Sequence, residues 1–200
     1  MSGAAKITVT ADGPYFVEGN LPLAHQHVVV NEAGESLDWR AGEAVPHRES
    51  YSLCRCGRSR KKPFCDGSHA RVRFDGTETA SHAPYAQQAQ RTQGPALVLE
   101  DAETLCAFAR FCDPHGQVWN LVGQSADQHA AALAEQEAGR CPSGRLVARR
   151  RLDAPALEPT LVPSIGLIQD TAEGVAAGSG RAAKSPSSAR RATRTKSAIA

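Results

Sequence analysis

Four side chains that bind soft metal ions stand within one stretch of sixteen residues. They are Cys54, Cys56, Cys65 and His69, in the pattern C-x-C, eight residues, C-x3-H. Thiolates combined with an imidazole bind either Zn²⁺ or an iron–sulfur cluster. Structural zinc loops usually separate paired cysteines by about two to four residues, so the single residue between Cys54 and Cys56 favours a larger cluster. A zinc site is the alternative.

The same stretch resembles the CDGSH iron–sulfur domain of the mitoNEET-like family. The family pattern is C-x-C-x2-(S/T)-x3-P-x-C-D-G-(S/A/T)-H, and residues 54–69 fit it at every specified position. Besides the four ligand types, the matching positions are Ser59, Pro63, Asp66, Gly67 and Ser68. The resemblance implies a [2Fe–2S] cluster near the protein surface, with Cys54 and Cys56 on one iron and Cys65 and His69 on the other.

A histidine ligand changes the chemistry expected of such a cluster. An imidazole in place of a thiolate removes one negative charge, so the cluster is easier to reduce than an all-cysteine one. The free ring nitrogen of His69 can carry a proton, which couples the potential or the release of the cluster to pH.

Basic residues surround this motif: Arg55, Arg58, Arg60, Lys61, Lys62, Arg71 and Arg73. Their positive field offsets the anionic cluster and suits an acidic redox partner or a protein that accepts the cluster. A solvated charged face explains the same residues equally well.

Three further cysteines form a second set. Cys106 and Cys112 have C-x5-C spacing, and Cys141, followed by proline, comes after a gap of 28 residues. This pattern resembles [3Fe–4S] ferredoxins, which lack the middle cysteine of C-x2-C-x2-C. The surrounding LCAFARFCDPHGQVWNLV and RCPSGRLV resemble a divergent iron-binding module that occurs beside CDGSH domains in bacterial proteins. The resemblance implies a second cluster, [3Fe–4S] or [4Fe–4S], on these three cysteines.

Two alternatives stay open for this second set. Cys106 and Cys112 can instead be buried cysteines on an apolar helix face, since free cysteine is often buried. His115, three residues after Cys112, is either a fourth ligand or a surface residue that follows a helix end.

Short strands must position the first motif. Alternating residues separated by Gly, Pro and Asn predict a small antiparallel sheet before Cys54, with strands at residues 6–10, 14–17, 27–31, 36–39 and 51–53. The last strand leads directly into Cys54.

The second half of the chain has helical periodicity. A helix with Asp101 as N-cap is predicted from the spacing of Leu105, Phe108, Ala109 and Cys112. The sequence Ser125-Ala-Asp-Gln128 has the form of a capping box. The helix that it opens is predicted to end at Gly139, with one face formed by Ala130, Leu133, Ala134 and Ala138.

These patterns predict an α+β protein with a small antiparallel β CDGSH module followed by a small helical cysteine module. We expect the [2Fe–2S] module in residues 1–75, a linker in 76–97, the second iron–sulfur-like module in 98–152, and a Pro/Ala-rich extension with a disordered basic tail in 153–200. Residues 181–200 hold six of the 23 Lys and Arg residues and no Asp or Glu. We expect this tail to be solvated, with nucleic-acid contact disfavoured.

Several classes of protein are disfavoured by the sequence. No run of ~18 apolar residues is present, which argues against a transmembrane helix. The first residues have no apolar segment of the secretory type, so we expect a cytoplasmic protein whose cysteines bind metal. No nucleotide-binding glycine loop, Ser-His-Asp set, paired-carboxylate site or HExxH motif is recognisable, and we expect no enzymatic activity.

The predicted function is iron–sulfur cluster binding, in one-electron transfer or in cluster storage and transfer. A redox or cluster-acceptor protein is the expected partner, and the resemblance allows a homodimer. The alternative is a zinc-stabilised interaction module whose basic tail contacts nucleic acid.

Overall fold

A computed structural model describes residues 5–168 of the chain. The chain divides into two compact units, and each contains segments that are far apart in the sequence. Of the described residues, unit 1 comprises 5–26, Ala41–Ser81 and 163–168, whereas unit 2 comprises His27–Arg40 and His82–Val162. The predicted basic tail lies outside the described residues.

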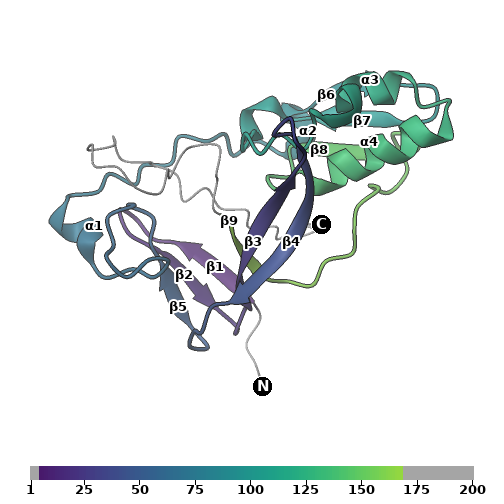
Figure 1. The fold of residues 1–200 in the computed structure, drawn as a ribbon. Coiled ribbons are helices and arrows are strands. Elements are labelled where there is room, and N and C mark those ends of the chain that lie inside the picture. Colours follow the sequence, from purple (N-terminus) through teal and green to yellow (C-terminus); the bar gives the residue numbers. More distant parts are fainter. Residues whose placement is uncertain (1–4, 169–200) are drawn as a thin grey trace. The chain divides into compact units, whose positions relative to one another are not determined.

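The first sheet of unit 1 is antiparallel and has three strands in the order β1-β2-β5 (Figure 1). The strands are β1 (Lys6–Val9), β2 (Tyr15–Glu18) and β5 (Tyr51–Leu53). Alternation places Val17 and Leu53 in the interior, where both are buried. The strands predicted around residues 6–10, 14–17 and 51–53 are therefore confirmed.

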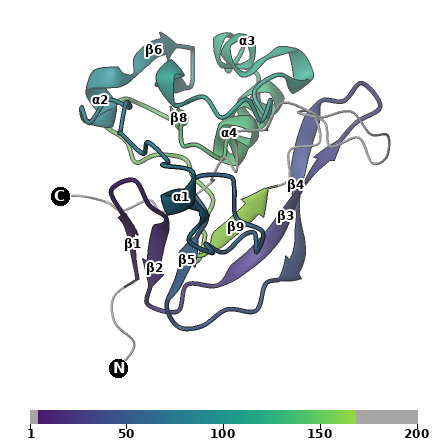
Figure 2. The same ribbon diagram turned by 90° about the vertical axis from the view of Figure 1, so that its left-hand side faces the viewer.

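A long hairpin is shared between the two units. It consists of β3 (Leu23–Val30) and β4 (Ser36–Ala44), which form a twisted ribbon (Figure 2). The side chain of Asn31 shapes the turn, because its Oδ1 accepts hydrogen bonds from the backbone N–H groups of Ala33 and Glu35. Both strands are longer than the sequence predicted.

A strand absent from the prediction, β9 (Ile165–Ile168), completes the sheet in the order β4-β3-β9. It pairs in parallel with Leu23–Gln26 at the start of β3. The buried core of unit 1 draws on both of its sheets and comprises Val17, Leu21, Leu23, Tyr51, Leu53 and Ile165.

Unit 2 combines a three-stranded antiparallel sheet with two helices that pack on it (Figure 1). The sheet has the order β6-β7-β8, with β6 (Gln90–Gln93), β7 (Val98–Asp101) and β8 (Leu146–Arg149). The helices are α3 (Val118–Gly123) and α4 (Gln128–Arg140). Their shared core is built from small and medium side chains: Leu97, Leu99, Val118, Leu121, Val122, Ala130, Ala131, Ala134, Ala138, Leu146 and Ala148.

The remaining elements are short. They are α1 (Ser68–Arg71), α2 (Tyr85–Gln88) and two 3₁₀ turns at Glu103–Leu105 and Pro114–Gly116. The structure therefore places α2 and β6 within residues 76–97. The α+β class is confirmed, and the second cysteine module holds strands as well as helices.

The helix predicted through residues 105–112 is wrong. Only a 3₁₀ turn forms at its start, and Phe108 and Arg110 adopt left-handed backbone conformations with φ of 55° and 59°. A continuous right-handed helix excludes such residues. Phe108 is also 65 % exposed, so the apparent apolar face is not buried as a unit. Asp101 is the last residue of β7 and not a helix cap.

The helix predicted after Ser125 is confirmed, but its cap is two residues later. Asp127 is the N-cap of α4, and its carboxylate accepts a hydrogen bond from the backbone N–H of His129. Ser125 is buried and its hydroxyl instead accepts hydrogen bonds from the N–H groups of Ala96 and Leu97. This serine therefore connects α4 to the start of β7.

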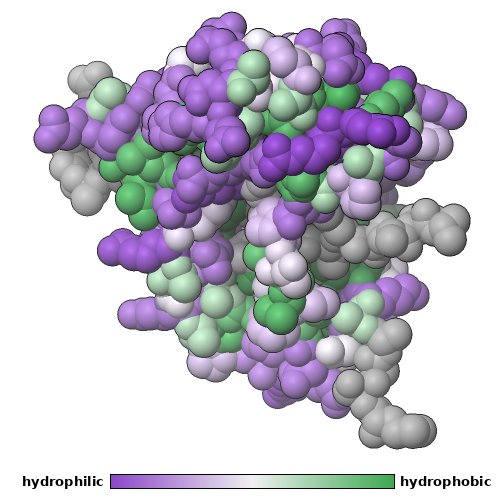
Figure 3. All heavy atoms as spheres, turned by 90° about the vertical axis from the view of Figure 1, so that its right-hand side faces the viewer, coloured by the Kyte–Doolittle hydropathy of each residue, from purple (hydrophilic) through white to green (hydrophobic). Residues whose placement is uncertain are grey.

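The face drawn in Figure 3 is mainly hydrophilic, and its hydrophobic residues form small separate groups. Among the described residues, the most exposed large hydrophobic side chains are Phe108 and Val162. Every helix within residues 5–168 is too short or too polar to cross a membrane.

Candidate metal centres

The first candidate centre lies in a closed loop that follows β5. The N–H of Cys54 donates to the carbonyl of Pro63 at 2.8 Å, and the N–H of Cys65 donates to the carbonyl of Ser52 at 2.8 Å. These two bonds join the ends of the loop. The buried hydroxyl of Ser59 fixes its middle, because it donates to the carbonyl of Phe64 at 2.6 Å and accepts from the N–H of Lys61.

Asp66 and Gly67 direct the chain from this loop into α1. The Asp66 carboxylate accepts hydrogen bonds from the N–H groups of Arg60 and Ser68, both at 3.0 Å. These bonds hold the pKa of Asp66 well below its usual range, and the bond from Arg60 has the largest effect. Gly67 has φ of +81°, a conformation that favours glycine. The sharp turn places His69 in the first turn of α1, on the same loop as Cys65.

The four predicted ligands form two pairs. The sulfur atoms of Cys54 and Cys56 are 3.8 Å apart, and Sγ of Cys65 is 3.3 Å from Nδ1 of His69. Two thiolates bound to one tetrahedral metal at ~2.3 Å lie ~3.8 Å apart, and a thiolate and an imidazole lie ~3.5 Å apart. Each pair therefore has the spacing of two ligands on a single metal atom.

Backbone N–H groups face two of these sulfur atoms. The N–H of Arg58 donates to Sγ of Cys56 and the N–H of Gly67 donates to Sγ of Cys65, each at 3.4 Å. Such hydrogen bonds stabilise negative charge on sulfur and are one means by which a protein sets the potential of a cluster.

Arg55 points away from the sulfur atoms, although it stands between Cys54 and Cys56 in the sequence. Its side chain is only 10 % exposed, and its guanidinium lies 5.5 Å from the ring centroids of Tyr15 and Phe74. It also donates to the carbonyl of Gly76. Arg55 therefore holds unit 1 together, and the exposed basic face consists of Arg58, Arg60, Lys61, Lys62, Arg71 and Arg73.

The second candidate centre brings together the other three predicted residues. Cys106, Cys112 and Cys141 all line one small pocket, together with Ala109 and Phe108. Cys112 and Cys141 also pack against the core of unit 2. Burial raises the pKa of the Cys112 thiol to about 12, and the charges of Asp113 and Cys141 add to the shift. Binding of a metal to Cys112 must therefore displace its proton.

The loop between Cys106 and Cys112 curls around this pocket. The left-handed conformations of Phe108 and Arg110 bend it, and the N–H of Phe108 donates to Sγ of Cys106 at 3.4 Å. The first centre has the same arrangement, in which the N–H two residues after a cysteine faces its sulfur.

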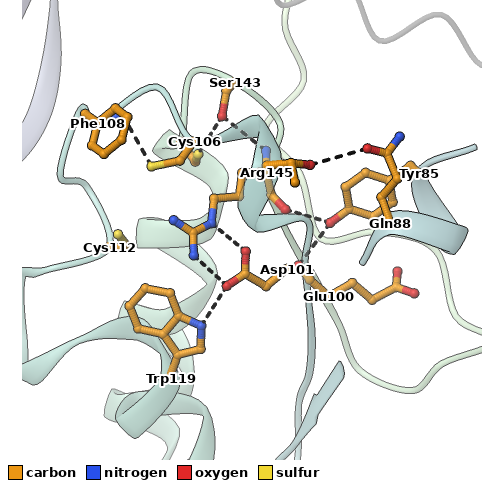
Figure 4. A network of polar contacts seen from close by, with 12 residues as sticks. Tyr85, Gln88, Glu100, Asp101, Cys106, Phe108, Cys112, Trp119, Ser143 and Arg145 are labelled. Atoms are coloured by element: carbon orange, nitrogen blue, oxygen red, sulfur yellow. Dashed lines mark hydrogen bonds and ion pairs between the residues drawn. The ribbon is translucent and has the colours of Figure 1, made fainter. Parts of the chain in front are cut away.

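A largely buried ion pair stands beside the three-cysteine pocket, which Arg145 also lines (Figure 4). The guanidinium of Arg145 donates two hydrogen bonds to the carboxylate of Asp101, at 2.5 and 2.8 Å, and the indole N–H of Trp119 donates to the same carboxylate. The bonds to Asp101, and then one to Cys106, raise the pKa of Arg145 above its ordinary value. A permanent positive charge is thereby held next to the Cys106 sulfur. Sequence reasoning missed this pair, and no local motif marks it.

His115 forms a pair of its own. Its Nδ1 lies 3.0 Å from Oε1 of the buried Glu137. Burial raises the pKa of Glu137 to about 7, against the opposing hydrogen bond from His115. His115 is not among the residues that line the cysteine pocket. Across residues 5–168, no three His, Cys, Asp or Glu side chains are arranged to hold a single metal ion.

Both centres thus present soft donors in the form that iron–sulfur proteins use, and comparison with protein families agrees. The family described as the iron-binding zinc finger of CDGSH type matches residues 12–70. The family described as a divergent 4Fe-4S mono-cluster matches residues 92–151. The chain therefore contains a CDGSH domain and a divergent 4Fe-4S domain, and it is an iron–sulfur-binding protein. None of the curated proteins matches it.

Proposed function

We propose that residues 54–69 bind a [2Fe–2S] cluster and that the protein transfers single electrons between protein partners. The observation that carries the proposal is the division of the four ligands into two pairs, Cys54 with Cys56 and Cys65 with His69. A cluster of two irons needs two ligands on each iron. Such a cluster supplies one-electron chemistry, and the chain supplies the ligands, the N–H groups that face the sulfur atoms and the basic surface.

We also propose that Cys106, Cys112 and Cys141 hold a second cluster, a [3Fe–4S] or [4Fe–4S] unit. The shared pocket of these three residues supports it. Two redox groups in one chain suit a relay in which the protein itself has no substrate and no enzymatic activity. Six free cysteines are also consistent with the reducing cytoplasm as its location.

Storage and transfer of the cluster is a second candidate role. His69 is only partly buried and lies on a helix of four residues, so solvent and an acceptor protein can reach this ligand. This access supports release of the cluster to an acceptor.

The substitution His69→Cys tests the proposal and separates the two roles. A fourth thiolate adds negative charge, so we expect a lower potential for the first cluster and slower release to an apo-acceptor. His82→Cys is the matched control, because His82 is an exposed histidine outside the motif. An unchanged potential contradicts the proposed ligand, whereas a lower potential with unchanged release supports electron transfer alone.

We further propose an acidic protein as the partner of the first centre. The exposed basic residues around the cluster include Lys61 and Lys62, which lie in the loop that carries three of the ligands. Electrostatic attraction increases association rates and weakens as salt screens it. The double variant Lys61→Glu, Lys62→Glu is expected to transfer electrons to the partner more slowly than the wild type at low salt. At high salt the two transfer rates are expected to be equal. Equal rates at low salt contradict this partner.

A further inference from the structure

A tryptophan from the first half of the chain packs inside unit 2. Trp39 lies in β4, within the segment His27–Arg40 that belongs to unit 2. It falls inside residues 12–70, which match the CDGSH family, and outside residues 92–151, which match the divergent 4Fe-4S family. Neither match therefore relates it to the three-cysteine centre.

Trp39 contacts the residue that precedes Cys112. Its ring stacks on that of Phe111 with a centroid separation of 4.5 Å and an angle of 33°. Phe111 is only 2 % exposed, although it lies in an irregular loop. An aromatic pair at this distance contributes ~0.5–1.5 kcal/mol beyond its buried area. The stack fixes the loop at the point where it reaches Cys112.

The same side chain also contacts the residue that precedes Cys141. The indole N–H of Trp39 donates to the carbonyl of Arg140 at 2.8 Å, across 101 residues of sequence. Arg140 is the last residue of α4, where a helix leaves carbonyl groups without intrahelical partners. The neighbouring Asp38 forms an ion pair with Arg140 at 2.8 Å. The hairpin therefore caps the helix end that carries Cys141.

One rigid side chain thus joins the loop that carries Cys112 to the helix end that carries Cys141. We propose that Trp39 is a positioning residue for the second cluster, and that the β3–β4 hairpin is part of its binding site. The inference rests on the proposed second cluster. It predicts that residues 92–151 are insufficient to hold that cluster firmly, because the residue that joins two of its ligand segments lies 53 positions before residue 92.

Three substitutions separate the contacts of Trp39. Trp39→Phe keeps a ring for stacking on Phe111 but removes the N–H that reaches Arg140. Trp39→Ala removes both contacts. Val30→Ala is the control, since Val30 lies in the same hairpin and is half exposed.

The experiment follows the loss of each cluster from the full-length protein in the presence of an iron chelator, by native mass spectrometry. The first cluster is the internal control in every molecule. We expect the second cluster to be lost ~3–10-fold faster in Trp39→Phe and more than ~10-fold faster in Trp39→Ala, because a hydrogen bond and then the aromatic stack are removed. The first cluster is expected to keep its wild-type lifetime, and Val30→Ala is expected to behave as the wild type.

Hydrogen exchange of the apoprotein gives a second readout that needs no cluster. Amides at the end of α4 are expected to exchange faster in both Trp39 variants, and those of residues 106–112 in Trp39→Ala, with unchanged exchange in β6, β7 and β8. Wild-type lifetimes of the second cluster in both Trp39 variants overturn the inference and leave the proposed function intact. If the wild-type protein holds no second cluster, both the inference and the proposed second cluster are overturned.

Discussion

The Nδ1 atom of His69 lies 3.3 Å from the sulfur of Cys65, and α1 and the turn at Gly67 hold this pair together. Cys65 and His69 form one pair of ligands, and Cys54 and Cys56 form the other. The arrangement joins one thiolate–imidazole pair to one all-thiolate pair.

The substitution Cys141→Ser tests the separation of the two centres. Cys141 lines the second pocket and lies outside the first loop. We expect the visible absorption of the second cluster to disappear and that of the first to persist. The reciprocal variant Cys54→Ser is expected to give the opposite result. If both spectra persist in Cys141→Ser, the second set is made of structural cysteines.

Ala109 offers a gain of function at the second centre. It stands three residues after Cys106 and three before Cys112, where a middle cysteine is missing, and it lines the same pocket. The variant Ala109→Cys adds a fourth thiolate, so we expect the second cluster to survive longer in the presence of a chelator. The exposed Ala132→Cys, on α4 and outside this pocket, is the control. If the second cluster of Ala109→Cys survives no longer than that of the wild type, the side chain at position 109 does not reach the cluster.

Arg145 is expected to raise the potential of the second cluster. Its positive charge stabilises the reduced, more negative state, so Arg145→Gln is expected to lower that potential by on the order of 50–100 mV. The variant also leaves the largely buried Asp101 without its guanidinium partner, at a cost of about 1–3 kcal/mol in the free energy of unfolding. Protein-film voltammetry and thermal unfolding measure the two effects.

The double variant Asp101→Asn, Arg145→Gln separates these effects. It removes both charges, so we expect it to recover part of the lost stability. The potential of the second cluster is expected to recover only in part, because loss of the Asp101 charge offsets some of the loss of the Arg145 charge. A potential equal to that of Arg145→Gln indicates that the charge of Arg145 alone sets the effect.

Glu137 makes the stability of unit 2 dependent on pH. Its pKa is about 7 in the folded chain, whereas an unfolded glutamate has a pKa of ~4.3, so the folded chain holds the proton more tightly. Its contribution to stability is therefore full below about pH 4 and is lost as the pH rises through 7. His115 and Arg140 lower this pKa and Asp113 raises it.

In the variant Glu137→Gln, the side chain at position 137 is uncharged at every pH. We expect this variant to match the wild type near pH 4 and to exceed its stability at pH 8 by on the order of 1–3 kcal/mol. Thermal unfolding at the two pH values measures the difference, with the exposed Glu103→Gln as control. The same offset between Glu137→Gln and the wild type at both pH values contradicts the raised pKa.

The first centre was largely predictable because its residues are local. The ligands, the turn at Gly67 and the bonds of Ser59 and Asp66 all lie within residues 54–69, so spacing alone describes them. The strand before Cys54 was also predicted with correct bounds, since alternation and turn residues mark it clearly.

The second centre was predictable only in its cysteines. The 3.6-residue periodicity of Leu105 and Phe108 suggested a helix. Instead, the left-handed conformations of Phe108 and Arg110 bend this segment into a loop around the pocket that the three cysteines line. The supports of this centre come from distant segments: Trp39 is 101 residues from its acceptor Arg140, and Asp101 is 44 residues from Arg145. No local pattern encodes contacts of that kind.

Native mass spectrometry of the anaerobically purified protein tests the central claim most directly, because it weighs the bound inorganic content and the oligomer at once. We predict a mass excess equal to one [2Fe–2S] cluster plus a second iron–sulfur unit per chain, with the first lost in Cys54→Ser and the second in Cys141→Ser. Zinc alone, without acid-labile sulfide, contradicts the account and leaves a zinc-stabilised module in its place.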